Sequence, residues 1–299
     1  MRSLDGIFPP IPTPFDRRGR LALPRLRENL TVWNRSSLSG YVVLGSNGEA
    51  PLLAYEERLS LIEAARTSIP TDRTMIVGTG CESTEATIRL TRDAARLGAD
   101  LALVLPPHYY KDQMTEAALV RHYRAIADSS PIPILIYNIP ATTGIDIEEG
   151  TVARLAEEEN IVGLKDSSGN LVKFGAIRRS TPPSFKLLAG SASFLLPALT
   201  LGGCGGILAL ANLSPERTIE ILRLFDEGRI DEARAIQLSL IPANDAITRR
   251  LGIPALKAGL DMIGMYGGPV REPLLPLGDE ERKNLRRILI EAGIVKEGR

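Results

Sequence analysis

The stretch NIVGLKDSSGN, residues 160–170, carries the most informative pattern in the chain. Residues 161–164 form a short apolar run that predicts a buried strand, and the small polar residues 166–169 predict the loop after it. Lys165 is therefore expected at the carboxyl end of that strand, where poor solvation lowers the pKa of an amine. A neutral lysine amine forms imines with ketones. A single lysine in such a place more often only marks where a strand meets water. The residues at the other strand ends must therefore show whether Lys165 is reactive.

Composition excludes several classes of function. The 299 residues are 44% hydrophobic and 24% charged with zero formal charge, which is typical of a globular protein and gives no sign of a nucleic-acid or anionic-membrane partner. Cys81 and Cys204 predict no disulfide framework, and the first 15 residues resemble neither a signal nor a transit peptide, so we expect a cytoplasmic protein. The two histidines make a His/Cys metal centre unexpected, whereas magnesium held by carboxylates stays open.

Apolar runs and amphipathic stretches alternate along most of the chain. Strands are predicted at residues 6–11, 41–44, 74–77, 101–105, 134–137, 161–164, 185–189 and 206–210. Helices are predicted between them at residues 24–34, 55–68, 84–97, 115–129, 147–158, 171–180 and 194–201, with Ser83 or Thr84 and Thr115 as N-terminal caps. Eight such strands predict an α/β fold of the closed (β/α)8 barrel type. An open doubly wound sheet is the alternative, disfavoured because no phosphate-binding GxGxxG follows the first strand.

The pattern changes after about residue 214. Helices are predicted at 215–227, 231–246, 254–263 and 279–291 with no strands between them, and the Gly- and Pro-rich link 264–276 is predicted to be a loop. The first of these helices would be the eighth of the barrel. We therefore expect a catalytic barrel domain at residues 1–228 and a C-terminal helical region at residues 229–299.

Polar residues follow several of the predicted strands, and in a barrel the carboxyl ends of the strands meet at one mouth. Strand two leads into Gly45-Ser46-Asn47-Gly48-Glu49, a turn suited to binding an anion, although this is also common turn chemistry. Tyr137 ends strand five; taken alone it is most simply a core residue, but beside Lys165 it becomes a candidate proton carrier. Ser46 and either Tyr109 or Tyr110, after strand four, are candidate relay partners. Together these groups suit imine chemistry on a 2-oxo acid.

Three motifs resemble a known family. GSNGE at residues 45–49, YNIP at 137–140 and GLKDSSG at 163–169 look like the dihydrodipicolinate synthase and N-acetylneuraminate lyase superfamily of pyruvate-dependent aldolases. The resemblance extends from GIFPPIPTPF near the start to the last helices. Within the superfamily, the stretches GSNGEAPLL, GTGCEST, SPIPILIYNIPATTGID, LLAGSASF and RRLGIPALK most resemble 4-hydroxy-2-oxoglutarate aldolase.

The resemblance implies a role for each matching residue. Lys165 matches the lysine that forms the Schiff base, so no separate cofactor is expected, and Tyr137 matches the tyrosine that shuttles protons. Ser46 and Asn47 match the turn that binds the pyruvate carboxylate. The paired tyrosines match a motif from which one ring reaches a neighbouring active site, with a slight preference for Tyr109 over Tyr110. Members of the superfamily are typically homotetramers built from dimers, which would make this exchange possible here. Positions that line the substrate in relatives match Ser167, Gly190 and Ile207.

One departure from the synthases bears on the substrate. Synthases of this superfamily usually carry an arginine two residues after YNIP to hold a carboxylate, whereas this chain has Thr142 in a neutral stretch and so offers only a hydroxyl as a substrate contact there. This favours an aldolase that cleaves 4-hydroxy-2-oxoglutarate reversibly to pyruvate and glyoxylate. A 2-oxo-3-deoxy sugar acid aldolase or dehydratase, a dihydrodipicolinate synthase, and a catalytically silent binding or regulatory barrel are the alternatives.

Overall fold

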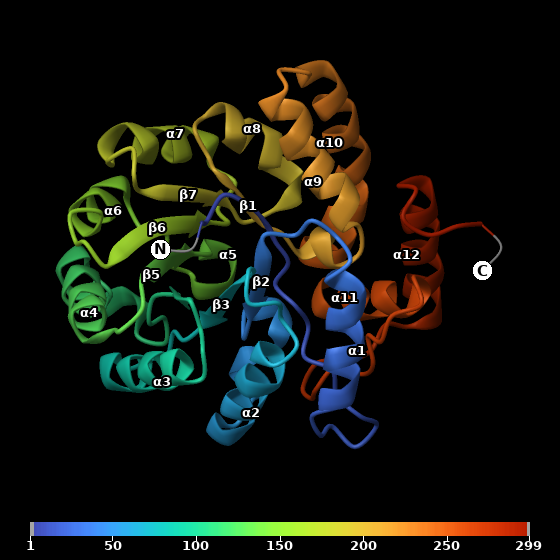
Figure 1. Cartoon of the computed structure of the whole chain (residues 1–299), viewed down its shortest axis with the longest axis horizontal. Coiled ribbons are helices and arrows are strands. Elements are labelled where there is room, and N and C mark those ends of the chain that lie inside the picture. The colour runs from blue at the N-terminus through green and yellow to red at the C-terminus, as the bar shows by residue number, and fades with distance from the viewer. Residues whose placement is uncertain (1–2, 298–299) are drawn as a thin grey trace.

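The computed structural model describes residues 3–297, so the first two and last two residues of the predicted domains lie outside it. Its sheet has eight parallel strands in the order β1-β8-β7-β6-β5-β4-β3-β2 (Figure 1). A parallel bridge between Pro10 and Val42 joins the two ends of this order and closes the ring. The (β/α)8 barrel predicted from the sequence is confirmed. The strands are Gly6–Phe8 (β1), Gly40–Val43 (β2), Thr74–Gly78 (β3), Leu101–Val104 (β4), Ile134–Asn138 (β5), Ile161–Asp166 (β6), Lys186–Ala189 (β7) and Gly205–Ile207 (β8).

One main helix follows each strand, and these helices surround the sheet (Figure 1). Ser83 and Thr115 cap the third and fourth, since each side-chain oxygen accepts a hydrogen bond from the backbone N–H three residues on. Gly98, with φ of 91°, follows the third helix in the left-handed conformation that ends a helix without steric cost. The helices are Leu23–Trp33 (α1), Tyr55–Arg66 (α2), Thr84–Arg96 (α3), Glu116–Ser129 (α4), Glu149–Leu155 (α6), Leu171–Ser180 (α7), Leu195–Thr200 (α8) and Pro215–Asp226 (α9).

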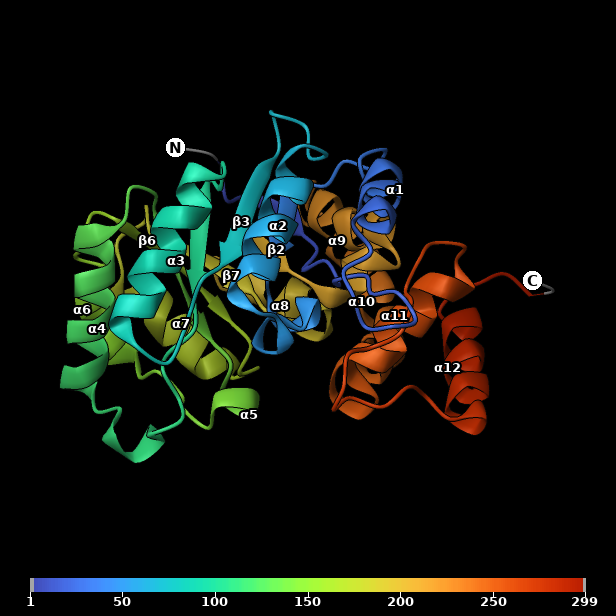
Figure 2. The same ribbon diagram turned by 90° about the horizontal axis from the view of Figure 1, so that it is seen from below.

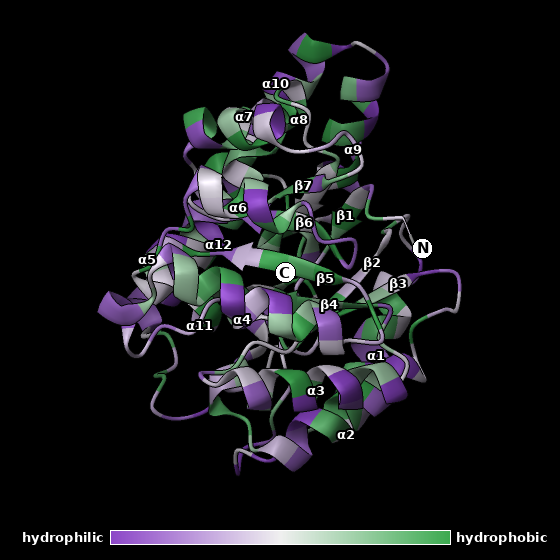
Figure 3. Cartoon of the chain, turned by 90° about the vertical axis from the view of Figure 1, so that its left-hand side faces the viewer, coloured by the Kyte–Doolittle hydropathy of each residue, from purple (hydrophilic) through white to green (hydrophobic). Residues whose placement is uncertain are grey.

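The apolar side chains form two buried layers because both faces of a parallel sheet are covered. One cluster, which includes Phe8, Val42 and Ile207, fills the inside of the barrel. The larger cluster lies between the strands and the helices, with Trp33 and Leu30 of α1 among its members. In Figure 3, β5 is hydrophobic along most of its length and turns pale at its carboxyl end. The carboxyl ends of the strands are therefore where polar side chains enter an otherwise apolar interior.

The C-terminal helices pack against one side of the barrel, beside α1 (Figure 2). Helix α10 contacts α9 and the turn Ala192–Phe194 that follows β7. The buried apolar cluster outside the strands continues into these helices through Leu240, Leu256 and Leu285. The predicted loop at 264–276 contains no helix or strand, whereas the boundary between residues 228 and 229 stays a prediction. The elements are Ile230–Asp245 (α10), the π-helical turn Ala246–Arg250, Gly252–Met262 (α11) and Asp279–Glu291 (α12).

Candidate active site

Lys165 and Tyr137 lie side by side on neighbouring strands. The register of β5 and β6 pairs Tyr137 directly with Lys165, and each residue is only 4% exposed. The Nζ atom of Lys165 lies 3.8 Å from the centre of the Tyr137 ring. Strand β6 runs two residues beyond the predicted end, to Asp166, so Lys165 is held by the sheet itself and not by the loop. The ladder of hydrogen bonds between strands thereby fixes the distance between the amine and the phenol.

A short turn after β2 brings a hydroxyl to the same place. Ser46–Gly48 forms one turn of 3-10 helix, and Ser46 Oγ lies 3.5 Å from the phenolic oxygen of Tyr137. The turn is flanked by Leu44 and Glu49, whose φ angles of 58° and 55° are left-handed although neither is glycine. Such strained residues persist only where the surrounding structure holds them in place, and they cluster at functional sites.

The electrostatics of the pair make the phenol of Tyr137 easier to ionise than usual. Burial by itself raises the pKa of Tyr137, but the neighbouring Lys165 and hydrogen bonding by Ser46 outweigh it, so the pKa lies below the ordinary value of 10.0. Ser167 contributes to this lowering of the pKa, yet its buried Oγ makes no well-aligned hydrogen bond within residues 3–297. A phenol that gives up its proton more easily than usual, beside an amine, is suited to moving protons to and from a substrate bound at that amine.

Replacing Ser46 with alanine is expected to raise the pKa of Tyr137. The serine hydroxyl stabilises the phenolate by hydrogen bonding, so its loss disfavours the charged form and the phenol keeps its proton to higher pH. The alkaline inflection in a pH profile of kcat/KM should therefore move to higher pH. Ser60→Ala on the exposed face of α2 is the matched control. An inflection that stays in place, or moves to lower pH, would contradict the assignment.

Behind this pair, the next residue of each strand points to the outer side of the barrel. Asn138 donates one hydrogen bond to Asp166 Oδ1 at 2.7 Å and another to Asp146 Oδ1 at 2.8 Å. Its own oxygen accepts from the backbone N–H of Ile147 at 3.0 Å, and Lys173 forms an ion pair with Asp146. Asn138 and Asp166 are each 1% exposed. This network cross-links β5 to β6 next to the reactive pair.

Sequence reasoning missed this network, although a signal was present. Asn138 and Asp166 directly follow the two residues predicted to react, and side chains alternate between the faces of a strand. Two polar residues at matching positions of adjacent strands would therefore lie on the same outer face. Asp146 and Lys173 come from the loop before α6 and from α7, and their approach depends on tertiary packing.

The remaining predicted site residues lie in several environments. Asn47 and Ser167 are half-buried next to the residues just described, and Ile207 is fully buried inside the barrel. Gly190 leaves space for the loop after β6, because a Cβ there would stand 1.9 Å from Ser167 Oγ. Thr142 is exposed in the short helix Pro140–Thr143 (α5).

Tyr109 and Tyr110 project into solvent from the loop after β4. They are 77% and 70% exposed, and their rings contact each other edge to face with centres 5.0 Å apart. In the part of the chain that the structure describes, no hydrogen bond or ring contact joins either ring to Lys165, Tyr137 or Ser46. Their role in the relay stays a prediction.

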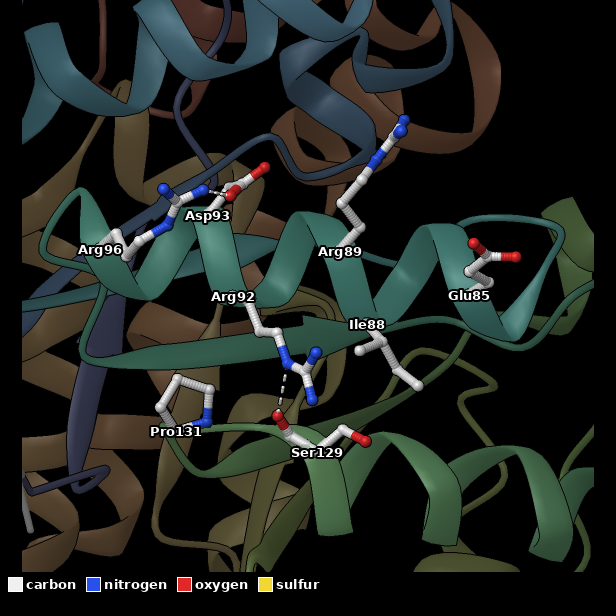
Figure 4. Close-up of a pocket in the computed structure, with 8 residues that line it drawn as sticks. All are labelled: Glu85, Ile88, Arg89, Arg92, Asp93, Arg96, Ser129 and Pro131. Atoms are coloured by element: carbon white, nitrogen blue, oxygen red, sulfur yellow. Dashed lines mark hydrogen bonds and ion pairs between the residues drawn. The ribbon is translucent and has the colours of Figure 1, made fainter.

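A hollow on the outer surface lies away from these residues. Figure 4 shows it along α3, with Arg92 donating a hydrogen bond to the backbone oxygen of Ser129 and Arg96 paired with Asp93. None of the predicted catalytic residues lines it; its lining is Glu85, Ile88, Arg89, Arg92, Asp93, Arg96, Ser129 and Pro131. The predicted chemistry therefore does not involve this hollow.

Comparison with known proteins shows the family of the chain. The model of the dihydrodipicolinate synthetase family matches residues 3–292. The chain belongs to that family. A 4-hydroxy-tetrahydrodipicolinate synthase of Methanothrix thermoacetophila is 37% identical over 95% of both chains. A probable mitochondrial 4-hydroxy-2-oxoglutarate aldolase of Emericella nidulans is also 37% identical, over 96% of this chain and 94% of that one.

Solved structures of the dihydrodipicolinate synthetase family have the same fold. A dihydrodipicolinate synthase from Bacillus anthracis superimposes with a TM-score of 0.93 at 29% identity, covering 97% of this chain and 99% of that one. A prophage protein of the family from E. coli K12, in complex with pyruvate, gives a TM-score of 0.92 at 28% identity with the same two coverages. The chain is thus a pyruvate-dependent class I aldolase of the dihydrodipicolinate synthetase family.

Enzymes of this family bind their substrate as a covalent Schiff base on a lysine and use no external cofactor. The buried Lys165 facing Tyr137 supplies a lysine in a setting suited to that reaction. Residues 3–297 contain no group of three or more His, Cys, Asp or Glu side chains that could hold a metal ion. Among the helices of the same residues, none is long and apolar enough to cross a bilayer.

Proposed function

We propose that the protein cleaves 4-hydroxy-2-oxoglutarate reversibly to pyruvate and glyoxylate through an imine at Lys165. The observation that carries the proposal is the buried amine facing the phenol of Tyr137, with the hydroxyl of Ser46 next to that phenol. In this arrangement, one group reacts with the ketone, one moves protons, and one turn is available for the carboxylate beside the ketone. The relative from Emericella nidulans, named as a probable aldolase for this substrate, supports the choice of substrate.

The reaction would proceed in three steps. The neutral amine of Lys165 adds to the C2 ketone, and the oxygen leaves as water with a proton supplied by Tyr137, which gives a protonated imine and leaves Tyr137 as a phenolate. The C4 hydroxyl then loses its proton to Tyr137, the C3–C4 bond breaks, and its electron pair moves into the imine to form an enamine while glyoxylate departs. Tyr137 returns the proton to C3, and water hydrolyses the imine to release pyruvate. Ser46 and Asn47 would hold the carboxylate at C1 throughout.

The absence of an arginine next to YNIP supports an aldolase over a synthase. In this chain the corresponding helix α5 presents Ala141, Thr142 and Thr143, none of which carries a charge. A neutral hydroxyl cannot replace the two parallel hydrogen bonds of a guanidinium to a carboxylate. A substrate whose binding depends on such a contact at this position should therefore be used poorly.

Two measurements test the proposal. Treating the protein with pyruvate and borohydride should add one pyruvate-sized mass to Lys165, found by mass spectrometry of the peptides; no adduct would end the imine mechanism. Pyruvate release should be faster from 4-hydroxy-2-oxoglutarate than from a 2-oxo-3-deoxy sugar acid, and faster than pyruvate consumption with aspartate semialdehyde. A preference for either of the other substrates would keep the imine and replace the proposed substrate.

The assembly and location of the protein complete the proposal. We propose a homotetramer built from dimers, in which the exposed Tyr109 or Tyr110 reaches the active site of a neighbouring subunit. We also propose a cytoplasmic location, on the basis of the sequence composition described above. Sedimentation velocity tests the first proposal, and fractionation of the producing cell tests the second.

A further inference from the structure

A buried ion pair joins the anion-binding turn to the C-terminal helices. Glu49, which ends the turn that begins at Ser46, pairs its carboxylate with the Nζ of Lys257 in α11. Each residue is 1% exposed. Burial lowers the pKa of Lys257, and the adjacent Glu49 carboxylate opposes that shift. None of the steps proposed above uses either group, so their place beside the turn needs another explanation.

Further contacts keep this pair away from water. Lys257 Nζ also donates to the carbonyl oxygen of Pro269 at 2.8 Å, and the other oxygen of Glu49 accepts from the backbone N–H of Arg271 at 2.8 Å. The ring of Phe15 lies under both cations, 4.4 Å from Lys257 Nζ and 4.3 Å from the Arg271 guanidinium carbon. The guanidinium itself is held by two hydrogen bonds to Glu57, at 2.6 and 2.7 Å. Glu49 is thus held in place by contacts with a segment that lies more than two hundred positions further along the chain.

The turn needs these contacts because its backbone conformation is unfavourable. Glu49 has the left-handed φ of 55°, a conformation that side chains other than glycine rarely adopt. On the other side, Thr13 Oγ1 donates to the carbonyl oxygen of Gly48 at 2.6 Å. The turn is therefore fixed at its last two residues, while Ser46 and Asn47 are left half-buried and Ser46 Oγ lies 3.5 Å from the phenolic oxygen of Tyr137.

A buried ion pair is a weak source of stability, because the cost of removing two charges from water offsets most of their attraction. It does fix the relative positions of the two segments that carry the charges, because each buried charge requires its partner at one position. We propose that Glu49 and Lys257 are positioning residues that hold the Ser46–Asn47 turn in the shape that binds the substrate's carboxylate, so that the C-terminal helices take part in substrate binding. The inference rests on the proposed function of that turn.

Two ketones separate a positioning role from a general structural one. Pyruvate has a carboxylate for the turn to bind, whereas hydroxyacetone reacts with the same amine without one. In Lys257→Met, the pyruvate concentration that half-saturates borohydride trapping at Lys165 should rise roughly 10- to 100-fold, the loss expected for a misplaced binding group. Trapping by hydroxyacetone should be unchanged, and in turnover KM should rise far more than kcat falls.

Two further variants serve as controls. Lys186→Met removes an ion pair with Asp5 at the opposite, amino-terminal end of the strands and should leave both ketones unaffected. The double variant Glu49→Gln/Lys257→Met leaves no unpaired buried charge, so its melting temperature should recover while its pyruvate half-saturation stays raised. If Lys257→Met does not fold, the double variant carries the same comparison.

The outcomes are distinguishable. Three results would each overturn the inference and leave the proposed function standing. Lys257→Met could lose trapping equally for both ketones, or it could keep an unchanged half-saturation by pyruvate. In the double variant, pyruvate binding could recover together with the melting temperature. If the unmodified protein forms no adduct with pyruvate, the proposed function fails and the inference fails with it.

Discussion

Replacing Lys165 with methionine is expected to lower the rate of pyruvate release by roughly 10,000-fold or more, because the loss of a covalent nucleophile removes the reaction path itself. Methionine is close to lysine in length and suits a site that is 4% exposed. The fold should therefore survive, and circular dichroism should show an unchanged spectrum. Steady-state release of pyruvate from 4-hydroxy-2-oxoglutarate measures the effect, and the mass added by pyruvate and borohydride should disappear.

Lys173→Met separates loss of the nucleophile from loss of a lysine near the site. Lys173 is also buried, and it is paired with Asp146 behind the strands, so its removal should lower stability more than it lowers the rate of trapping. Retention of a substantial rate by Lys165→Met, or a pyruvate adduct on another lysine in that variant, would refute the assignment of Lys165.

Tyr137→Phe is expected to lower kcat by roughly 100-fold or more, the usual contribution of a positioned proton donor and acceptor. The ring stays in the barrel interior, and the lost hydroxyl lies 3.5 Å from Ser46 Oγ, which is a long contact, so little stability should be lost. The pyruvate adduct should still form, but more slowly. In the unmodified protein the ionisation of Tyr137, whose pKa lies below its ordinary value, should cause an alkaline inflection of kcat/KM. Phenylalanine has no group that ionises, so this inflection should vanish from the pH profile of the variant.

Tyr123→Phe is the matched control for this change. Tyr123 is fully buried in α4, and its hydroxyl donates a hydrogen bond to the carbonyl oxygen of Val104 at 3.0 Å. Burial raises the pKa of Tyr123, opposite to Tyr137, and its removal should affect stability without changing the pH profile. A Tyr137→Phe variant with the wild-type rate would make Tyr137 a packing residue of the barrel.

Much of the fold was predictable because its signals are local. Apolar runs bounded by turn residues located all eight strands. β1 ends at Phe8 and not at residue 11, because Pro9 and Pro10 have no N–H to continue the ladder, and Pro10 instead forms an isolated bridge with Val42. Helix ends shifted by one to three residues, as at α6, where frayed turns carry little sequence signal. The short helix α5 escaped prediction because four residues are too few for a periodic pattern.

The sequence by itself determined the barrel and placed Lys165 and Tyr137 near the ends of adjacent strands, because both follow from local periodicity. It also indicated an aldolase, because short motifs carry the resemblance to that class of enzyme. Only the tertiary structure decided the hydrogen-bond network around Asn138 and the ion pair between Lys257 and Glu49. Those contacts join positions distant in sequence, and a buried charge finds its partner through the packing of whole helices, which no local pattern encodes.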